Sequence, residues 1–125
     1  MLPIVLVFVG GGLGAVLRYG MSIGVTRLAG TGFPVATLSI NVFGSFLMGL
    51  VVAWFAFRGE GGQEWRLFLT TGVLGGYTTF SAFSLETMLL YERGDTMLAA
   101  LYVVLSVVVS VLALAAGLAV VRSLT

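Results

Sequence analysis

The chain has 125 residues, of which 59% are hydrophobic and 9% are charged, and its mean hydropathy is +1.14. A soluble domain of this length buries too little surface to hide that much apolar side chain, so the composition indicates an integral membrane protein. The net charge of +1 gives no electrostatic basis for nucleic-acid binding, and the absence of Cys and His excludes disulfides, thiolate chemistry and His-ligated metals.

Four apolar segments follow one another along the chain, and each is long enough to cross a bilayer as a helix. They are predicted over residues 3–25, 35–57, 65–90 and 96–121. The first has no basic residue before it and no small-residue cleavage site after it, so it is interpreted as a mature span rather than a signal peptide. The fold class expected is an all-α integral membrane protein, with residues 1–125 forming a single four-helix domain. Its predicted connections are residues 30–32, the polar run 58–64 and the turn 91–95.

All six basic residues are arginines, and they divide evenly between the two ends of the predicted bundle. Arg58, Arg66 and Arg122 fall on the side of the termini, and Arg18, Arg27 and Arg93 fall on or near the other side. The positive-inside rule therefore has almost nothing to act on. Two interpretations remain open: one weakly biased topology, or insertion in both orientations. Dual insertion would let two copies pair antiparallel, with the inverted-repeat symmetry that transporters use.

Polar side chains form a stripe in the second segment and another in the fourth. Each stripe has the i, i+4, i+8 spacing that places three side chains on one helix face. The two sets are Thr37, Asn41 and Ser45, and Tyr102, Ser106 and Ser110. Such residues commonly hydrogen-bond between membrane helices, but a hydroxyl track could also replace the water shell of an anion. A pore or site role is favoured for Asn41, which is mid-span and a strong donor.

The sharpest signal is the run GVLGGYTTFSAFS at residues 72–84. Gly75-Gly76 and the β-branched Thr78-Thr79 make a poor helix interior, which predicts a break near the middle of the third span. A break frees backbone groups at membrane depth, and it is tolerated only if these face protein, water or an ion. The ends of the two half-helices could then bind ions. The alternative is that the glycines simply allow close helix packing.

Phe80 and Phe83 follow the predicted break at i, i+3, and Ser84 and Thr87 continue their face. Phenylalanines in membrane helices usually face lipid. Beside a break and a Ser/Thr stripe, however, their positive ring edges could coordinate a small anion. They would bind it less tightly than a buried arginine, and conduction needs weak, multiple sites. Glu86, near the end of this segment, is interpreted either as a solvated rim residue or as part of a vestibule.

The first segment carries a glycine run at residues 10–15 that formally matches G-x-G-x-x-A. No strand precedes it in a βαβ pattern, so dinucleotide binding is excluded. Gly10 and Gly14 instead form a small-xxx-small pair suited to tight helix packing. Arg18, one turn further on, either reaches the lipid headgroups or draws anions into a vestibule.

Three motifs together resemble the Fluc (CrcB) family of fluoride ion channels: GGLGAVLRY at 11–19, TLSINVFGSF at 37–46 and GGYTTFSAFS at 75–84. The resemblance covers the whole chain in length, span count and motif order. It implies a dual-topology, antiparallel homodimer of four-helix subunits in the cell inner (plasma) membrane. It also implies two fluoride pathways per dimer, through which cytoplasmic fluoride leaves passively.

The resemblance further implies roles for individual residues. Phe80 and Phe83 match the family's pair of pathway phenylalanines, and Asn41 matches its pore asparagine. The family's structural sodium ion lies at the dimer interface, and the backbone carbonyls that match its ligands here are those of Gly75 and Thr78 in both subunits. Glu86 and the stripe of the fourth segment correspond to polar pathway positions, although no sharp motif fixes their register.

Three competing functions fit the residues less well. A small proton-coupled multidrug exporter is also a short, dual-topology four-helix chain, but it needs a carboxylate deep within a span. Segments one, two and four contain no Asp or Glu, and Glu86 lies near a span end. A non-transporting assembly subunit would explain the glycines but gives no reason for the break. An enzyme is not expected, because no nucleophile–base pair or metal-ligand set is visible.

Overall fold

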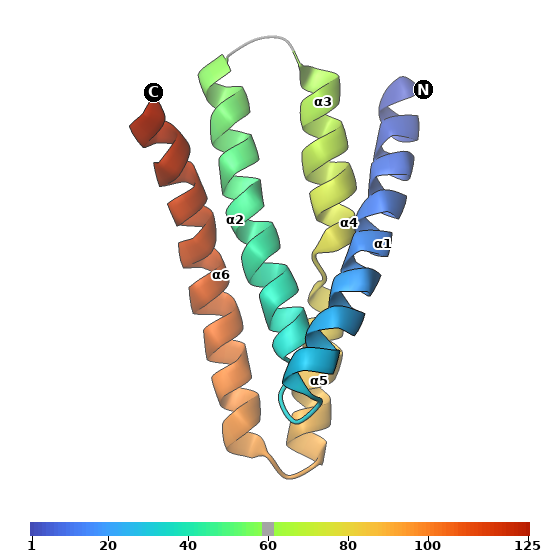
Figure 1. The fold of residues 1–125 in the computed structure, drawn as a ribbon, viewed down its shortest axis with the longest axis vertical. Coiled ribbons are helices and arrows are strands. Elements are labelled where there is room, and N and C mark those ends of the chain that lie inside the picture. Colours follow the sequence, from blue (N-terminus) through green and yellow to red (C-terminus); the bar gives the residue numbers. More distant parts are fainter. Residues whose placement is uncertain (59–61) are drawn as a thin grey trace.

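The computed structural model describes residues 1–58 and 62–125, and every regular element in these ranges is helical (Figure 1). Three helices are long and continuous: α1 (Leu2–Ala29), α2 (Val35–Arg58) and α6 (Thr96–Leu124). Between α2 and α6 the chain forms a column of four shorter elements. They are α3 (Gln63–Leu67), the π-helical segment η1 (Phe68–Leu74), α4 (Gly75–Tyr77) and α5 (Phe80–Glu92).

Within the described ranges, α1, α2 and α6 are long and apolar enough to cross a membrane. The chain is therefore an all-helical protein with several apolar spans, as an integral membrane protein requires. The helices extend a few residues beyond the predicted spans, because side chains such as Arg27 can reach the polar interface while the backbone stays helical.

The predicted polar connection over residues 58–64 is wrong at both ends. Arg58 still belongs to α2, and α3 already begins at Gln63. Residues 59–61 of this predicted connection lie outside the described residues. The other two connections are found where they were predicted but with shifted bounds: residues 30–34 rather than 30–32 separate α1 from α2, and residues 93–95 rather than 91–95 separate α5 from α6.

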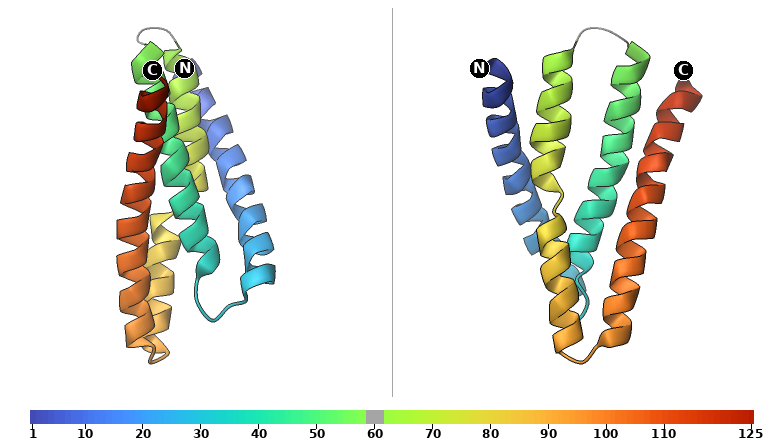
Figure 2. Two further views of the ribbon diagram at one scale, coloured as in Figure 1. Left: turned by 60° about the vertical axis from the view of Figure 1, so that its left-hand side comes forward. Right: turned by 180° about the vertical axis from the view of Figure 1, so that it is seen from behind.

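The helices are arranged as two pairs that diverge toward the end carrying both termini (Figure 1). One pair is α2 and α6, and the other is α1 with the upper part of the column (Figure 2). The two pairs meet at the opposite end, where Tyr102, Leu90 and Ala99 form a buried cluster. This cluster holds α5 against α6, so the lower half of the column belongs with the α2–α6 pair.

Glycines bring backbones into contact in both pairs. A Cβ built on Gly117 would lie 2.9 Å from the backbone nitrogen of Leu50 in α2, and one on Gly49 would lie 3.0 Å from that of Leu118 in α6. In the other pair, a Cβ on Gly10 would lie 3.0 Å from Gly72 Cα. The expected tight packing of the Gly10 and Gly14 face is confirmed, because both glycines are buried against η1 and α4.

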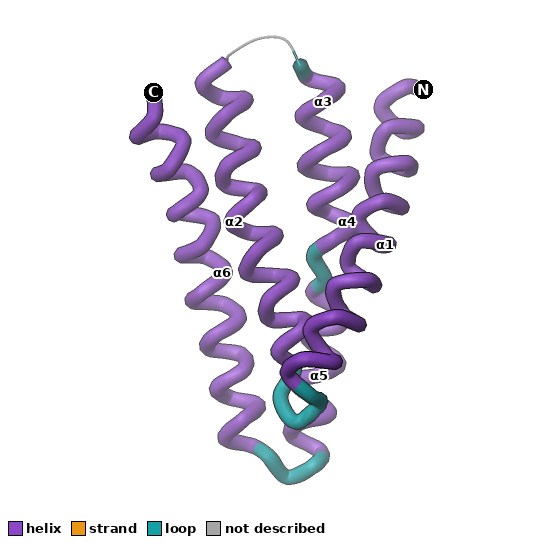
Figure 3. The backbone as a smooth tube through the Cα atoms, in the orientation of Figure 1, coloured by secondary structure: helices purple, strands orange, loops and turns teal. Residues whose placement is uncertain are grey.

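The column is interrupted at Thr78 and Thr79, which have extended backbones with φ/ψ of −81°/158° and −151°/119° (Figure 3). Gly75 is helical, with φ −63° and ψ −38°, and Gly76 lies within α4. The interruption thus falls at the two threonines of the predicted run, and the paired glycines remain helical. Gly76 instead gives α1 room to approach, since a Cβ there would lie 2.9 Å from Gly11 Cα.

Candidate functional site

The interruption of the column is held by a side chain from the neighbouring helix α2. Asn41 donates from Nδ2 to the Thr79 carbonyl oxygen at 3.0 Å, and its Oδ1 accepts from the Thr79 backbone N–H at 2.9 Å. One amide thus satisfies both backbone groups of the most extended residue. The Thr79 hydroxyl in turn accepts from the Ala82 backbone N–H at 3.1 Å and caps the start of α5.

These bonds divert two N–H groups from the carbonyls they would meet in a continuous helix. The Thr79 N–H would bond to Gly75 C=O, and the Ala82 N–H would bond to Thr78 C=O. Because Asn41 and the Thr79 hydroxyl take these donors, the carbonyl oxygens of Gly75 and Thr78 lose their helical partners. Hard cations such as sodium are coordinated by oxygen ligands, including backbone carbonyl oxygens. The free carbonyls of Gly75 and Thr78 therefore fit a site for such a cation.

A groove of about 420 Å³ runs beside the interruption, between α2, the column and α6. Its lining combines polar residues with the two predicted phenylalanines. Among the residues that line the groove are Asn41, Ser45, Thr78, Thr79, Phe80, Phe83, Ser106 and Ser110. The structure therefore brings together, along one groove, most of the residues that the sequence assigned to a fluoride path.

The aromatic rings of the groove are in contact with one another. The Phe80 and Phe83 ring centroids lie 5.3 Å apart, and those of Phe83 and Tyr102 lie 5.2 Å apart. Phe83 is half-buried by this contact, whereas Phe80 is 77% exposed in the single chain. The two rings therefore form one aromatic ledge with a half-buried inner ring, Phe83, and an exposed outer ring, Phe80.

Two hydroxyls on the α6 side of the groove have no protein partner. Ser106 and Ser110 each bury their Oγ atom, and neither finds a hydrogen bond within the described part of the chain. An unsatisfied buried hydroxyl costs free energy, so such groups are kept where water or a ligand completes them. Both residues line the groove, so their O–H groups are available to water or to an ion that enters it.

The remaining predicted residues of the path lie elsewhere. Ser84 and Thr87 turn their hydroxyls back to the carbonyls of Phe80 and Phe83, at 3.0 and 2.8 Å, and neither lines the groove. Tyr102 is fully buried and donates from its hydroxyl to Glu86 Oε1 at 3.1 Å. In the single chain these three residues are therefore behind the groove wall or outside it.

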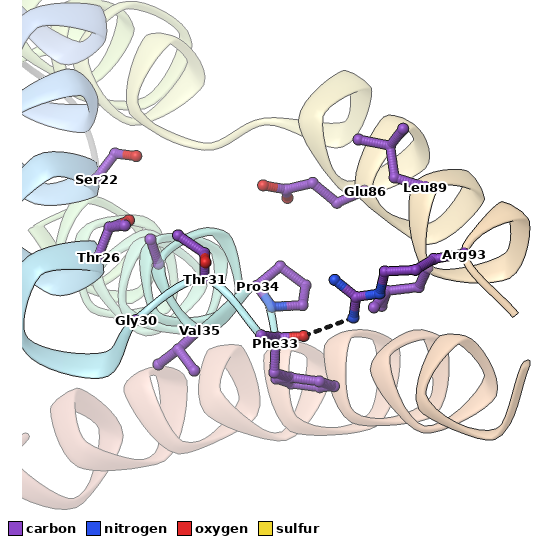
Figure 4. A pocket seen from close by; sticks show the side chains of 13 residues that line it. Ser22, Thr26, Gly30, Thr31, Phe33, Pro34, Val35, Glu86, Leu89 and Arg93 are labelled. Carbon is purple, nitrogen blue, oxygen red and sulfur yellow. Dashed lines mark hydrogen bonds between the residues drawn. The ribbon is translucent and has the colours of Figure 1, made fainter. Parts of the chain in front are cut away.

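Glu86 faces a second cavity, a chamber of about 240 Å³ near the end of the bundle opposite the termini (Figure 4). Ser22 and Thr26 of α1 and the 30–36 segment line it together with Glu86. Arg93 closes one side by donating from Nη2 to the Gly32 carbonyl at 2.8 Å. The chamber combines one carboxylate with several hydroxyls, which makes it polar enough to hold water.

Arg18 has a role that neither sequence interpretation gave it. Its Nε donates to the Gly76 carbonyl at 3.3 Å, at the carboxyl end of the helical run that stops at Tyr77. A guanidinium there supplies a donor to a carbonyl freed by the interruption and complements the negative end of the helix dipole.

Sequence reasoning also missed Thr79 as a cap. Its signal was present, because a threonine directly before a run that resumes helical periodicity is a common N-cap. No comparable signal marked the bonds from Asn41 and Arg18 to the backbone of the column, since a bond between residues 38 or 58 positions apart leaves no local pattern.

The fold and the groove thus define a helical membrane protein whose polar and aromatic residues gather beside an interrupted helix. The chain belongs to the CrcB family, because residues 5–118 match the family described as "CrcB-like protein, Camphor Resistance (CrcB)". Residues 59–61 are the only part of this matched range that the structure does not describe.

Curated relatives cover nearly the whole chain. A protein of Nitrobacter hamburgensis named "Fluoride-specific ion channel FluC 2" is 62% identical over 120 residues, 96% of this chain and 97% of that protein. Proteins named "Fluoride-specific ion channel FluC" are 57% identical in Rhodopseudomonas palustris, over 96% of this chain and 97% of that one, and 52% identical in Agrobacterium fabrum, over 99% of each. These relatives are named as ion channels and not as enzymes.

Proposed function

We propose that this protein is a fluoride channel, through which cytoplasmic fluoride leaves the cell passively across the inner (plasma) membrane. The observation that carries the proposal is the groove, in which Phe80 and Phe83 lie with two partnerless hydroxyls and Asn41 beside an interrupted helix. The names of the relatives give the ion, and the groove supplies groups suited to it.

Fluoride is small and strongly hydrated, so a path through the membrane must return favourable contacts as water leaves. The O–H groups of Ser106 and Ser110 can each donate one hydrogen bond, and the ring edges of Phe80 and Phe83 add favourable electrostatics. None of these groups carries a full positive charge. An ion that enters such a groove can therefore leave again, as conduction requires.

The proposal includes an antiparallel dimer. Phe80 is 77% exposed and the groove is open along one side in the single chain, so a second copy is needed to enclose the path. The even division of the arginines between the two ends supports insertion in both orientations. Each chain carries one groove, so the dimer has two pathways.

A structural sodium ion at the dimer interface is part of the same proposal. The carbonyls of Gly75 and Thr78 have lost their helical partners, and Gly75 is exposed on the single chain. Two copies related by a two-fold axis would supply four such oxygens. The ion would then stabilise the dimer by mass action rather than take part in conduction.

The test of the function is fluoride efflux from liposomes containing the purified protein, with chloride-loaded liposomes as the matched control. Fluoride efflux without chloride efflux supports the proposal. Equal efflux of both ions, or of neither, in protein that elutes as a folded species, contradicts it. A proton-coupled exporter finds no support in the relatives, which are named as channels.

A further inference from the structure

The amide of Asn41 is engaged on both of its ends by one residue of another helix. Its Nδ2 donates to the carbonyl of Thr79, and its Oδ1 accepts from the N–H of the same residue. The two bonds close a ring between the side-chain amide and the peptide backbone. No other residue of α2 makes a side-chain hydrogen bond to the column within the described residues.

From this geometry we infer that Asn41 is a positioning residue, which acts on the ion path by holding the Thr78–Thr79 interruption open. This goes beyond its proposed place in the lining of the groove, and it rests on the proposed function only for its consequence on flux. The interruption sets where α5 begins, and α5 begins with Phe80. The position of both rings therefore depends on the conformation that Asn41 stabilises.

The backbone of Thr79 explains why a side chain is needed. Its N–H and C=O lie at membrane depth and have no helical partner, because residues 78 and 79 are extended. Unsatisfied backbone groups are expensive in an apolar surrounding, so without Asn41 the extended segment would lose its fixed conformation and open to water. The start of α5, and with it both rings, would then no longer be held in one position.

The two bonds also fix which way round the amide lies. Thr79 offers one donor and one acceptor, so turning the amide over would place donor against donor and acceptor against acceptor. Nδ2 has a second N–H, and Asn41 lines the groove. The bonds to Thr79 thus hold the amide in one orientation, so the position of this second N–H is fixed. An amide that could turn over would present its oxygen, an acceptor, in that position half of the time.

The experiment is hydrogen–deuterium exchange resolved to residues 77–83 in the purified full-length protein, together with fluoride efflux for the same samples. Asn41→Ala removes both bonds. We expect exchange at Thr79 and Phe80 to rise by about tenfold, since a lost buried hydrogen bond corresponds to roughly that factor in an opening equilibrium. Fluoride efflux should fall in the same samples. A residue that only contacts the ion would lower efflux and leave exchange unchanged.

Two matched variants keep the test decisive. Ser45→Ala changes a groove residue on the same face of α2 that makes no hydrogen bond to Thr79 within the described residues, so exchange at residues 77–83 should stay at the wild-type rate. Thr79→Ala removes the cap but leaves both bonds to Asn41, so exchange should rise at Ala82 and not at Thr79. If Asn41→Ala does not fold, Asn41→Leu replaces it: the apolar side chain has a similar shape and can make neither bond, so exchange should again rise.

Unchanged exchange in Asn41→Ala or Asn41→Leu overturns the inference. Faster exchange with wild-type efflux also overturns it, because the interruption would then not position the path. If the wild-type protein conducts no fluoride, the proposed function fails by itself. The exchange measurement then still decides whether Asn41 holds the interruption.

Discussion

The α2–α6 pair and the interrupted column solve the problem of polar groups in a membrane in opposite ways. In α2 and α6 the backbone is continuous, so its N–H and C=O groups bond within each helix and the helices pack glycine to glycine at Gly49 and Gly117. The polar groups left over are side chains, the hydroxyls of Ser106 and Ser110. In the column the groups without helical partners are in the backbone, and the side chains of Asn41, Thr79 and Arg18 form hydrogen bonds with them.

The groove lies where these two solutions meet. One wall carries two hydroxyls that have no hydrogen-bond partner among the described residues, and the other carries the extended backbone to which the Asn41 amide bonds. Stability alone would favour removing the serines, because a buried hydroxyl without a partner costs free energy. Both features therefore leave polar groups along one groove that water or an ion can complete.

The largest effect is expected on the close-packed side. Gly117→Ala places a Cβ 2.9 Å from the Leu50 backbone nitrogen and against the Phe46 carbonyl, and backbone atoms cannot move aside as side chains can. We expect a loss of about 3 kcal/mol in stability, the upper part of the usual range for overpacking. Thermal unfolding in detergent, followed by size exclusion, measures it.

The control for this change is Gly24→Ala. A Cβ on Gly24 meets nothing within 4 Å, so the substitution should leave stability unchanged or raise it by up to about 1 kcal/mol through helix propensity. Equal stability of the two variants would show that α2 and α6 do not depend on backbone contact.

The next effect concerns the aromatic ledge. Phe80→Ile keeps apolar bulk and removes the ring edge, so fluoride efflux should fall about fivefold, corresponding to the roughly 1 kcal/mol that such aromatic electrostatics contribute. Folding should be unaffected, since Phe80 is 77% exposed in the single chain. Phe83→Ile should lower efflux as well and also cost stability, because Phe83 packs against Tyr102.

Phe8→Ile is the matched control for Phe80→Ile. Phe8 is 81% exposed on α1 and does not line the groove, so its replacement should leave efflux at the wild-type rate. Wild-type efflux in both groove variants, from well-folded protein, would mean that these rings only pack.

Much of this arrangement could be predicted from the sequence, and the limits have a physical cause. Apolar run length determined the long helices, and the i, i+4 spacing placed Ser106 and Ser110 on one face. The sequence does not determine where in the run the helix is interrupted, because the glycines and the threonines are both poor helix formers. The structure places the interruption at Thr78–Thr79, while Gly76 stays helical and packs closely against Gly11 of α1.

The site was predicted least well where one residue acts through another. Ser84 and Thr87 share a helix face with the phenylalanines, but hydroxyls in helices readily bond to the carbonyl four residues earlier, and both do so here. Glu86 and Tyr102 come from segments whose register no motif fixes, so their mutual bond could not be expected.

A smaller effect, of opposite sign on stability and function, is expected at Ser106. Ser106→Ala removes a buried hydroxyl that has no partner in the described chain, so stability should rise by about 1 kcal/mol. Fluoride efflux should fall, because the path loses a donor. Ser123→Ala on the same helix is the control: its hydroxyl bonds to the Val120 carbonyl at an exposed site, and neither property should change. A destabilised Ser106→Ala would show that the hydroxyl has a structural partner.

The smallest effect is expected at the end of the bundle where the two pairs meet. Arg93 and Asp95 form an exposed salt bridge at 2.7 Å, with side chains 50% and 41% accessible. Exposed pairs of this kind contribute about 0.5 kcal/mol or less, so Asp95→Asn should scarcely change the unfolding temperature. Arg93→Gln should have a larger effect, of about 1 kcal/mol, because it also removes the bond to the Gly32 carbonyl that ties the 30–34 connection to the 93–95 turn. Unfolding at low and high salt separates the two contributions, since screening weakens the ion pair far more than the bond to a carbonyl. Equal loss in both variants would mean that the salt bridge, and not the link across the chamber wall, holds this end of the molecule together.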